Sequence, residues 1–341
     1  MHQSHRSPVN RRSVLKGTLG ASLLTAGLSQ TALARQEASP QVSEESRTVA
    51  AANGDVTITG TPQRVVVMEY ELTENLVALG VEPVGVCEPE SVNNWVPLPE
   101  PLADSIVDVG TRDEPDIEAI IGLEPDLILA ASPRQDAMLA NLESIAPTVQ
   151  LETYSPMSAP EGLTPIEHFK HILTQVAVAT NRQAEAETAI AEFDALLEAG
   201  TAAVAQTEFA GRPFVYAGVS EFTSVNLFNE HSRIAHTIGQ LGLINQAGEN
   251  SETPGLHYQT LSIEELGTLP EDTLFFVALS PQITEEATEL FEGELWQGMP
   301  WVQAGGFINL GEPNVWTAGS AITLSNLIER VTESLGAPLD S

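Results

Sequence analysis

One arginine lies among seven carboxylates in the segment VDVGTRDEPDIEAIIGLEPDLILA, from Val107 to Ala130. That residue, Arg112, is a candidate ligand-binding cation, because a guanidinium stays charged when partly buried and presents its N–H donors in a fixed fork. Such a group suits the oxygens of an anionic or metal-chelating ligand. The same arginine could instead be structural and pair with Asp113, Glu114 or Asp116. The residues by themselves leave both roles open.

Other patterns that could support chemistry are weak. The chain has no GxGxxG, P-loop or GxSxG motif. His168 and His171 are three residues apart and could supply two metal ligands, but no third ligand is evident. His231 and His236 are five apart, which does not suit one helical face. The single cysteine, Cys87, excludes an intrachain disulfide and is expected to be a small buried residue. We therefore predict no catalytic residues, no protein-held metal and no enzyme activity.

The charge of the chain is strongly negative. Its 341 residues carry a net charge of −33, and because the first 34 residues contribute +4, the remainder carries −37. This argues against nucleic acids and anionic membranes as partners. A cationic partner and adaptation to high salt are the two explanations left. Acids are spread along the chain and Lys170 is the only lysine after residue 34, which favours salt adaptation and predicts weaker folding at low ionic strength.

The amino-terminal segment has the features of an export signal. Arg11 and Arg12 precede a moderately apolar run that ends in Ala32-Leu33-Ala34. We interpret residues 1–34 as a twin-arginine signal peptide, cleaved near Ala34. Residues 35–55 are polar and aperiodic and are predicted to be a flexible leader. The mature protein is therefore expected in the periplasm, without a membrane anchor.

Short apolar strands alternate with helical segments in the first part of the mature chain. This alternation predicts a parallel sheet with helices on its faces. A helix is expected from Ser132 to about Ile145, with Ser132 as its cap and Pro133 at its first position. The other expected elements are strands at 65–68, 83–86, 126–131 and 148–151 and helices at 74–79 and 117–123. Together they form a predicted amino-terminal α/β lobe of residues 56–160.

The alternation of strands and helices stops after residue 160. Thr164-Pro165-Ile166-Glu167 is a strong helix start, and residues 161–181 are predicted to be a long linking helix. A second helix begins at about residue 182, and strand–helix alternation returns at 214–219 and 273–279, closing with a helix at 322–335. The predicted fold is α/β, with two lobes, each a mainly parallel sheet flanked by helices, joined by a single long helix. The second lobe spans residues 182–341. Two such lobes would form a ligand cleft at the carboxyl ends of their strands.

Several segments, in order, resemble one family. They are TPQRVVVMEYELTENLVALGVEPVGV, VDVGTRDEPDIEAIIGLEPDLILA and IAPTV in the first lobe, and LWQGMPWVQAGGFINL and VWTAGSA in the second. The chain resembles the periplasmic iron–siderophore binding proteins of ABC importers, whose fold is that of class III periplasmic binding proteins. Asn94-Trp95 followed by PLADSIVDVGTR makes it most similar to the ferric-hydroxamate, or ferrichrome-type, branch.

That resemblance implies a function. The protein would capture a ferric siderophore, which itself holds the iron, and deliver it to an inner-membrane ABC permease and its ATPase. No cofactor is implied, and a monomer is expected. In this branch the arginine at the position of Arg112 reaches the iron-binding oxygens. Trp95 and Trp316 match aromatic residues of the cleft, and Tyr70 and Tyr258 are weaker candidates.

One position departs from the family pattern. Ferrichrome-type binders place a tyrosine after the strand that corresponds to 126–131, and here Ser132 occupies that place. Either Arg134 compensates, or the ligand is a more anionic siderophore such as a citrate-based carboxylate–hydroxamate. The family also docks its permease through one acidic residue in each lobe, which by position would be Asp136 and Glu264.

Other functions stay open. The same fold could bind another iron chelate such as a catecholate, haem or cobalamin. An exported metal-dependent hydrolase is a second class, against which the missing nucleophile and ligand motifs argue. A signalling receptor would have the same sequence features as an importer's binding protein.

Overall fold

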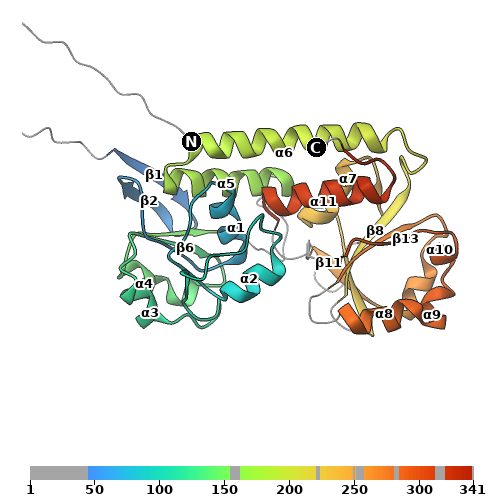
Figure 1. Cartoon of the computed structure of the whole chain (residues 1–341), viewed down its shortest axis with the longest axis horizontal. Coiled ribbons are helices and arrows are strands. Elements are labelled where there is room, and N and C mark those ends of the chain that lie inside the picture. Colours follow the sequence, from blue (N-terminus) through green and yellow to red (C-terminus); the bar gives the residue numbers. More distant parts are fainter. Residues whose placement is uncertain are drawn as a thin grey trace, which may run out of the picture. The chain divides into compact units, whose positions relative to one another are not determined.

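The computed structural model describes residues 45–153, 162–219, 223–248, 250, 257–279, 284–311 and 319–339. The predicted signal peptide, its cleavage site near Ala34 and the first part of the predicted leader lie outside these residues. Residues 44–341 form one compact unit. Within it the described residues build two large sheets, one from each predicted lobe, with helices packed on both, and a separate two-stranded hairpin (Figure 1).

The amino-terminal lobe contains a five-stranded parallel sheet in the order β5-β4-β3-β6-β7. Its central strands are continuous apolar runs that are buried on both faces, as parallel strands covered by helices must be. The strands are β3 (Val65–Val67), β4 (Gly85–Val86), β5 (Val107–Asp108), β6 (Leu127–Ala131) and β7 (Thr148–Leu151). The helices are α1 (Tyr70–Ala78), α2 (Pro89–Trp95), α3 (Ile117–Gly122), the 3-10 helix η1 (Asp136–Met138) and α4 (Leu139–Glu143).

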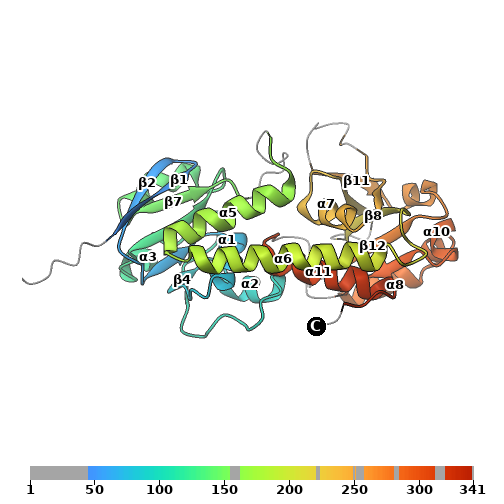
Figure 2. The same cartoon turned by 90° about the horizontal axis from the view of Figure 1, so that it is seen from above.

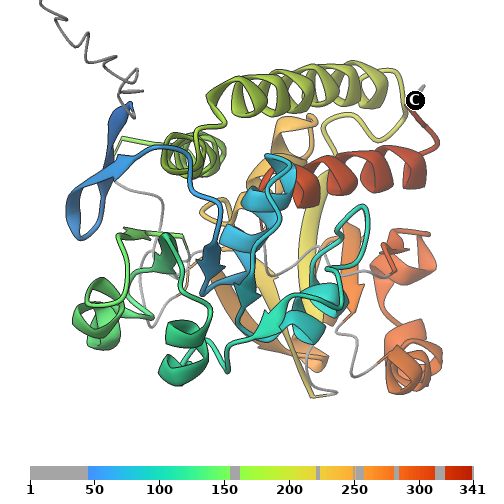
Figure 3. The same ribbon diagram turned by 60° about the vertical axis from the view of Figure 1, so that its left-hand side comes forward.

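A β-hairpin precedes this sheet and corrects part of the predicted leader. Strands β1 (Ser46–Ala51) and β2 (Gly54–Thr59) pair in antiparallel register, so residues 46–55 are ordered rather than a flexible leader. Val49 and Ile58 are buried, and the Arg47 guanidinium donates to the carbonyl of Ala179, with Nη2 at 3.1 Å. Figure 3 shows the blue hairpin beside the helix that carries this carbonyl. The buried Val49 and Ile58, the Arg47 contact and a bond from the N–H of Ala52 to the carbonyl of Gln150 join the hairpin to the lobe.

The helix predicted from Ser132 begins later than expected. Residues 132–135 form a turn in which the Ser132–Pro133 peptide bond is cis, and helical structure starts at Asp136. The reason is the fully buried Gln135, whose side-chain oxygen accepts from the backbone N–H of Ala131 at 2.7 Å. The Gln135 side chain therefore holds residues 132–135 in a turn at the end of β6, and the helix begins only after this turn.

Two long helices follow the first sheet. Helix α5 (Pro165–Thr180) begins with the predicted capping box between Thr164 and Glu167. Helix α6 (Gln183–Val204) is longer, with 22 residues, and packs on both α1 and α11 (Ala321–Ser334). Figure 2 shows α6 continuing along α11 into the second lobe. Since β8 follows α6 directly, we assign the connecting role to α6 rather than to residues 161–181.

The carboxyl-terminal lobe is built on a mixed sheet in the order β11-β9-β8-β12-β13, with β10 also paired to β8. Parallel pairs join β8 to β10 and β12, and β12 to β13, while β9 runs antiparallel to its neighbours. The strands are β8 (Pro213–Val219), β9 (Ser224–Phe228), β10 (Ile244–Asn245), β11 (Tyr258–Ser262), β12 (Leu274–Leu279) and β13 (Phe307–Asn309). The remaining helices are α7 (Arg233–Gln240), η2 (Glu264–Thr268), α8 (Thr284–Glu292), α9 (Glu294–Gln297) and α10 (Pro300–Gln303).

One apolar core runs through both lobes. Its buried side chains come from the first sheet, from α1, α5, α6 and α11, and from one face of the second sheet. The other face of the second sheet has its own core, where the Trp301 ring stacks on Phe275 at 4.3 Å between ring centroids and Trp296 packs edge-on. Trp296 and Trp301 are fully buried and are packing residues of this core. The predicted two-lobed α/β fold is therefore confirmed.

Candidate functional site

The carboxyl edge of the first sheet gathers the charged residues that could bind a ligand. Each parallel strand ends at this edge and is followed there by a loop. Open α/β sheets bind their ligands at this edge. The five loops carry Glu69 after β3, Glu88 after β4, Arg112 after β5, Arg134 after β6 and Thr153 after β7. The topology alone thus brings together residues that are far apart in the sequence.

The loop that presents Arg112 is tightly built. Gly110 has φ of +88°, and a Cβ at this position would lie 2.7 Å from the backbone nitrogen of Asp116, so the turn requires glycine. The side chain of Asp116 then caps α3 by accepting from the N–H of Ala119 at 3.0 Å. The carbonyl of Arg112 accepts from Gln135 Nε2 at 2.9 Å. The arginine backbone is therefore fixed from two sides.

The guanidinium of Arg112 is held by two carboxylates and an aromatic ring. Its Nη1 donates to Glu69 Oε1 and its Nε to Glu88 Oε2, each at 2.9 Å, and its Cζ lies 3.7 Å from the centroid of the Tyr70 ring. Burial works against the charge, but Glu69, Tyr70 and Glu88 together outweigh burial and raise the pKa of Arg112. The side chain stays protonated and keeps a quarter of its surface exposed.

A second arginine shares one of these carboxylates. Arg134 Nε lies 3.0 Å from Glu69 Oε2, and its Nη1 donates to Asp113 Oδ1 at 2.7 Å. Glu69 is only 5% exposed and also accepts from the N–H of Tyr70 at 2.9 Å, which makes it the cap of α1. One buried carboxylate therefore bridges both arginines and is anchored to a helix start.

A cavity of about 300 Å³ opens beside Arg134. Its walls combine the Arg134 and Glu69 charges with small side chains, which leaves polar groups facing an accessible space. The lining residues are Glu69, Asp113, Ala131, Ser132, Pro133, Arg134 and Thr153. This cavity, with Arg112 on the other side of Glu69, is the candidate site.

The structure places three more predicted residues at or near this edge. Tyr70 is buried, and its hydroxyl donates to Glu88 Oε2 at 3.1 Å, while burial raises the pKa of the phenol. Ser132 lines the cavity, and its hydroxyl donates to Asp136 Oδ1 at 3.0 Å. Asp136 is exposed and also accepts from Gln150 Nε2 at 2.8 Å.

The remaining predicted residues lie elsewhere. Trp95, the last residue of α2, is half-buried against the main core and is not among the residues that line the cavity. Tyr258 starts β11 and packs in tilted contact with Phe228, at 5.9 Å between ring centroids. Glu264 is exposed at the start of η2. Trp316 lies outside the described residues.

Sequence reasoning missed the carboxylates that hold the arginines. It considered the chain neighbours of Arg112 as its partners. In the structure Arg112 instead forms ion pairs with Glu69 and Glu88, and Asp113 forms an ion pair with Arg134. The sequence did contain a signal for these partners. Glu69 and Glu88 each follow a predicted strand, and because parallel strands end at one edge of a sheet, both acids could be expected near Arg112.

Sequence reasoning also missed a buried ion pair between the lobes. Arg233, the first residue of α7, forms an ion pair with Glu71 on α1, and both side chains are nearly buried. Its Nη2 also donates to the carbonyl of Thr153 at 3.1 Å and to His168 Nδ1 at 3.2 Å. Because Thr153 lines the cavity, this contact between lobes adjoins the candidate site.

The buried groups around this ion pair titrate abnormally. Burial raises the pKa of Glu71 to about 7, although Arg233 counteracts it. Burial and the Arg233 charge together lower the pKa of His168 to about 3, so this imidazole is neutral. Nearby, Glu74 Oε1 accepts from the N–H of Thr323 at 2.6 Å and thereby caps α11 across the lobe contact.

The described residues contain no metal site. Across the ranges that the structure describes, no three His, Cys, Asp or Glu side chains gather in a group that could hold an ion. His168 bonds to Arg233 rather than forming a metal pair with His171. Cys87 is buried as predicted, and burial raises the pKa of its thiol to about 12. Over the same described ranges, no helix is long and apolar enough to cross a membrane.

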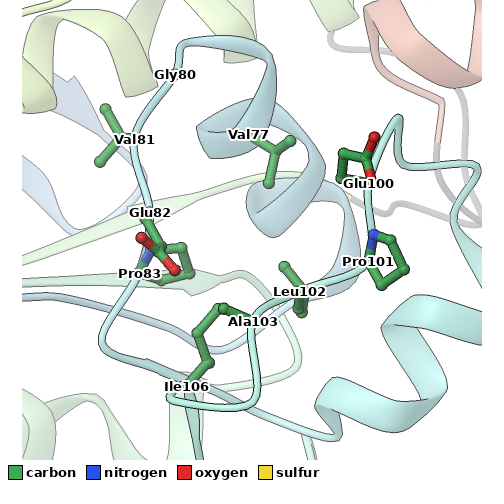
Figure 4. A pocket seen from close by; sticks show the side chains of 10 residues that line it. All are labelled: Val77, Gly80, Val81, Glu82, Pro83, Glu100, Pro101, Leu102, Ala103 and Ile106. Carbon is green, nitrogen blue, oxygen red and sulfur yellow. The ribbon is translucent and has the colours of Figure 1, made fainter.

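A second cavity differs in character from the first. It has a volume of about 250 Å³ and lies between α1 and the loops that precede β4 and β5, at the amino-terminal edge of the sheet (Figure 4). Its lining is mainly apolar and includes two acids, Glu82 and Glu100, but no basic residue. It therefore lacks a cation for an anionic or chelating ligand, and the candidate site remains at the carboxyl edge.

Comparison with known proteins gives the family. The profile of the family described as "Periplasmic binding protein" matches residues 65–313. The chain belongs to this family. Its members bind a solute rather than transform it, so this periplasmic binding protein is not an enzyme and carries no cofactor.

Among its relatives are two binding proteins of similar length. The Fe(3+)-citrate-binding protein YfmC of Bacillus subtilis is 28% identical, over 81% of this chain and 81% of that protein. The iron(3+)-hydroxamate-binding protein FhuD of Escherichia coli is 27% identical, over 81% of this chain and 88% of that protein. A solved structure of the siderophore-binding protein FhuD from Vibrio cholerae, bound to Fe3+–Desferal, is 30% identical with a TM-score of 0.68 and covers 80% of this chain and 97% of its own.

Proposed function

We propose that this periplasmic binding protein captures a ferric hydroxamate-type siderophore at the Arg112–Arg134 edge and delivers it to an ABC permease with its ATPase. The chain would be exported through the twin-arginine pathway, cleaved near Ala34, and work in the periplasm as a monomer. The observation that carries the proposal is the guanidinium of Arg112, fixed at the carboxyl edge of the first sheet beside a cavity whose lining includes Glu69 and Arg134.

The chemistry of a ferric hydroxamate fits this edge. The siderophore supplies all six oxygens to the iron, so the protein needs donors for those oxygens rather than ligands for the metal. A guanidinium offers such donors in a fixed plane and cannot lose its charge. Relatives that bind iron hydroxamates and Fe3+–Desferal share this fold and up to 30% of the sequence, which supports the hydroxamate class.

A ferric citrate-type ligand is the second candidate. A second arginine, Arg134, lines the cavity at the position beside the missing tyrosine, and a relative of comparable identity binds Fe(3+)-citrate. Two guanidinium groups at one site are a common arrangement for carboxylate ligands. Against this, both arginines already pair with carboxylates of the protein.

The remaining predicted contacts belong to the same proposal. Trp95, Trp316 and Tyr258 would contribute apolar surface to the shell of the siderophore, and Tyr70 would support Arg112 from below its guanidinium. Asp136 and Glu264 are both exposed, which suits residues that would face arginines of the permease.

Quenching of tryptophan fluorescence tests the function. The mature protein, in molar salt, is titrated with ferrichrome, ferrioxamine B, ferric aerobactin, a ferric catecholate, haem and cobalamin. We expect saturable quenching by the hydroxamate complexes and affinity lowered at least tenfold in Arg112→Ala. Arg182→Ala, which removes an exposed arginine 3.8 Å from Glu185, is the matched control and should bind normally.

Other outcomes are informative. Quenching by haem, cobalamin or the catecholate alone would keep the family and reject the hydroxamate ligand. Preference for ferric aerobactin would favour the citrate-type alternative. Unchanged affinity in Arg112→Ala would remove the arginine from the site.

A further inference from the structure

We infer that Glu69, aided by Glu88 and Asp113, makes this site select ferric complexes that carry no net negative charge. The inference rests on the proposed function, because it concerns the ligand of the same site. In it, Glu69 is the specificity-determining residue, since among the described residues it is the one carboxylate that contacts both arginines.

The position of Glu69 fixes its charge in place. One carboxylate oxygen lies 2.9 Å from Arg112 Nη1, and the other lies 3.0 Å from Arg134 Nε. The first oxygen also accepts from the N–H of Tyr70 at the start of α1. Glu69 is 5% exposed, accepts hydrogen bonds from Arg112 Nη1 and the N–H of Tyr70, and forms an ion pair with Arg134, so it cannot swing away to admit an anion without losing these contacts.

The local charges leave no excess of positive charge. The two guanidinium groups pair with three carboxylates, from Glu69, Glu88 and Asp113, so this cluster has a net charge of about −1. A ferric trihydroxamate is neutral, because three singly charged hydroxamates balance Fe(III). A ferric tris-catecholate carries three negative charges, and ferric citrate complexes are anionic as well. Only the first class avoids repulsion from the carboxylates.

The arginines nevertheless keep donors for a neutral ligand. The ion pairs of the described residues engage Nε and Nη1 of both Arg112 and Arg134, which leaves the Nη2 groups for ligand oxygens. Both side chains are partly exposed, at 25% and 30%. The site thus offers hydrogen-bond donors whose charge is already compensated, which suits oxygens of a neutral chelate.

Salt does not remove this selection. In molar salt the screening length is about 3 Å, so repulsion from the distant acids of the chain is lost. The carboxylates of the cluster lie within 2.7–3.0 Å of the arginines and act at the same short range as a bound ligand. Selectivity measured in molar salt therefore reports the cluster and not the overall charge.

The test compares ligands of different charge on Glu69→Gln, which keeps the acceptor oxygen and removes the charge. Affinities for cationic ferrioxamine B, neutral ferrichrome and anionic ferric aerobactin are measured by fluorescence quenching in molar salt. We expect the wild type to bind ferrichrome more tightly than ferric aerobactin, and Glu69→Gln to reduce that ratio about tenfold. The change should follow ligand charge, with aerobactin gaining most and ferrioxamine B losing. Glu185→Gln, which removes the charge of an exposed carboxylate 3.8 Å from Arg182 at the start of α6, is the matched control and should leave the ratio unchanged.

Each other result has a defined meaning. A ratio that Glu69→Gln leaves unchanged, in a variant that melts like the wild type, overturns the inference but not the proposed function. Tighter binding of aerobactin by the wild type overturns it as well. If Glu69→Gln does not fold, Glu88→Gln tests the inference instead. This variant removes the charge of the partly exposed partner of Arg112 and should shift the affinity ratio in the same direction by about threefold. Failure of the wild type to bind any ferric siderophore would reject the proposed function itself.

Discussion

The start of helix α1 serves two regions that use the same chemistry differently. At the carboxyl edge of the first sheet, Glu69 bridges two partly exposed arginines beside an open cavity. Two residues later, Glu71 forms an ion pair with Arg233 of the other lobe, and both are nearly buried. The comparison shows that the environment of an ion pair decides its use, since exposed arginines can donate to a ligand and buried ones can only hold the structure.

The buried pair should have the largest effect on stability. Arg233→Ala removes the partner of Glu71 and the donor to Thr153 and His168, and we expect the free energy of unfolding to fall by roughly 3–5 kcal/mol. Denaturant unfolding in molar salt measures it. Arg182→Ala, at an exposed pair, should cost less than about 1 kcal/mol. A loss below about 1 kcal/mol in Arg233→Ala would mean that the pair does not fasten the lobes.

The cap that α1 provides to α11 comes next. Glu74→Ala leaves the buried N–H of Thr323 without its acceptor, which should cost about 1–3 kcal/mol of unfolding free energy. Glu74→Gln keeps an oxygen acceptor in the same place and should cost less than half as much. Equal losses in the two variants would show that the charge, rather than the hydrogen bond, is what α11 requires.

At the cavity, a change of shape should affect binding more than stability. Arg112→Lys keeps one positive charge but cannot contact Glu69 and Glu88 with a planar fork over Tyr70. We expect the affinity for a ferric hydroxamate to fall about tenfold, or 1.4 kcal/mol, while the melting temperature changes little. Isothermal titration together with thermal melts separates the two effects. A large drop in melting temperature with unchanged affinity would give Arg112 a structural role, like that of Arg233.

The elements of the fold were largely predictable because their signals are local. The predicted strands at 126–131 and 148–151 correspond to β6 and β7, and the capping box at Thr164 begins α5 as expected. The hairpin of β1 and β2 was missed, because its short polar strands are held by contacts with residues distant in sequence, on α5 and β7. The cap expected at Ser132 failed for a similar reason, since Gln135 bonds to the strand instead. Both misses involve side chains acting on residues outside the local pattern.

The site was predictable only in part. Arg112 was expected at a strand end, but its partners Glu69 and Glu88 precede it by 43 and 24 residues. Spacing along one chain does not show which loops meet at a sheet edge, so the neighbouring acids looked like the natural partners. Arg233 carried no signal at all in the sequence, because its role depends on how α7 packs on α1 and α5. In a chain so rich in acids, burial rather than residue type sets Glu69 apart from the exposed carboxylates.

The smallest net effect is expected from pH at the buried contact, because His168 and Glu71 there act in opposite senses. His168 has a pKa of about 3 in the folded protein and about 6.5 when unfolded. As the pH falls from 6.5 toward 3, the unfolded chain binds a proton that the folded chain does not, so His168 makes the protein less stable. Glu71, with its pKa raised to about 7, acts in the opposite sense, because stability falls as the pH rises from 4.5 to 7.

Variants on one helix isolate the histidine term. His168→Gln should lose less stability than the wild type between pH 6.5 and pH 4, measured by urea unfolding in molar salt at each pH. His171→Gln is the matched control, since His171 is exposed on the same helix and should leave the pH dependence unchanged. Parallel pH profiles for the wild type and His168→Gln would show that the imidazole is protonated without cost beside Arg233. The contact between α5 and α7 would then be more open to water than the burial of His168 indicates.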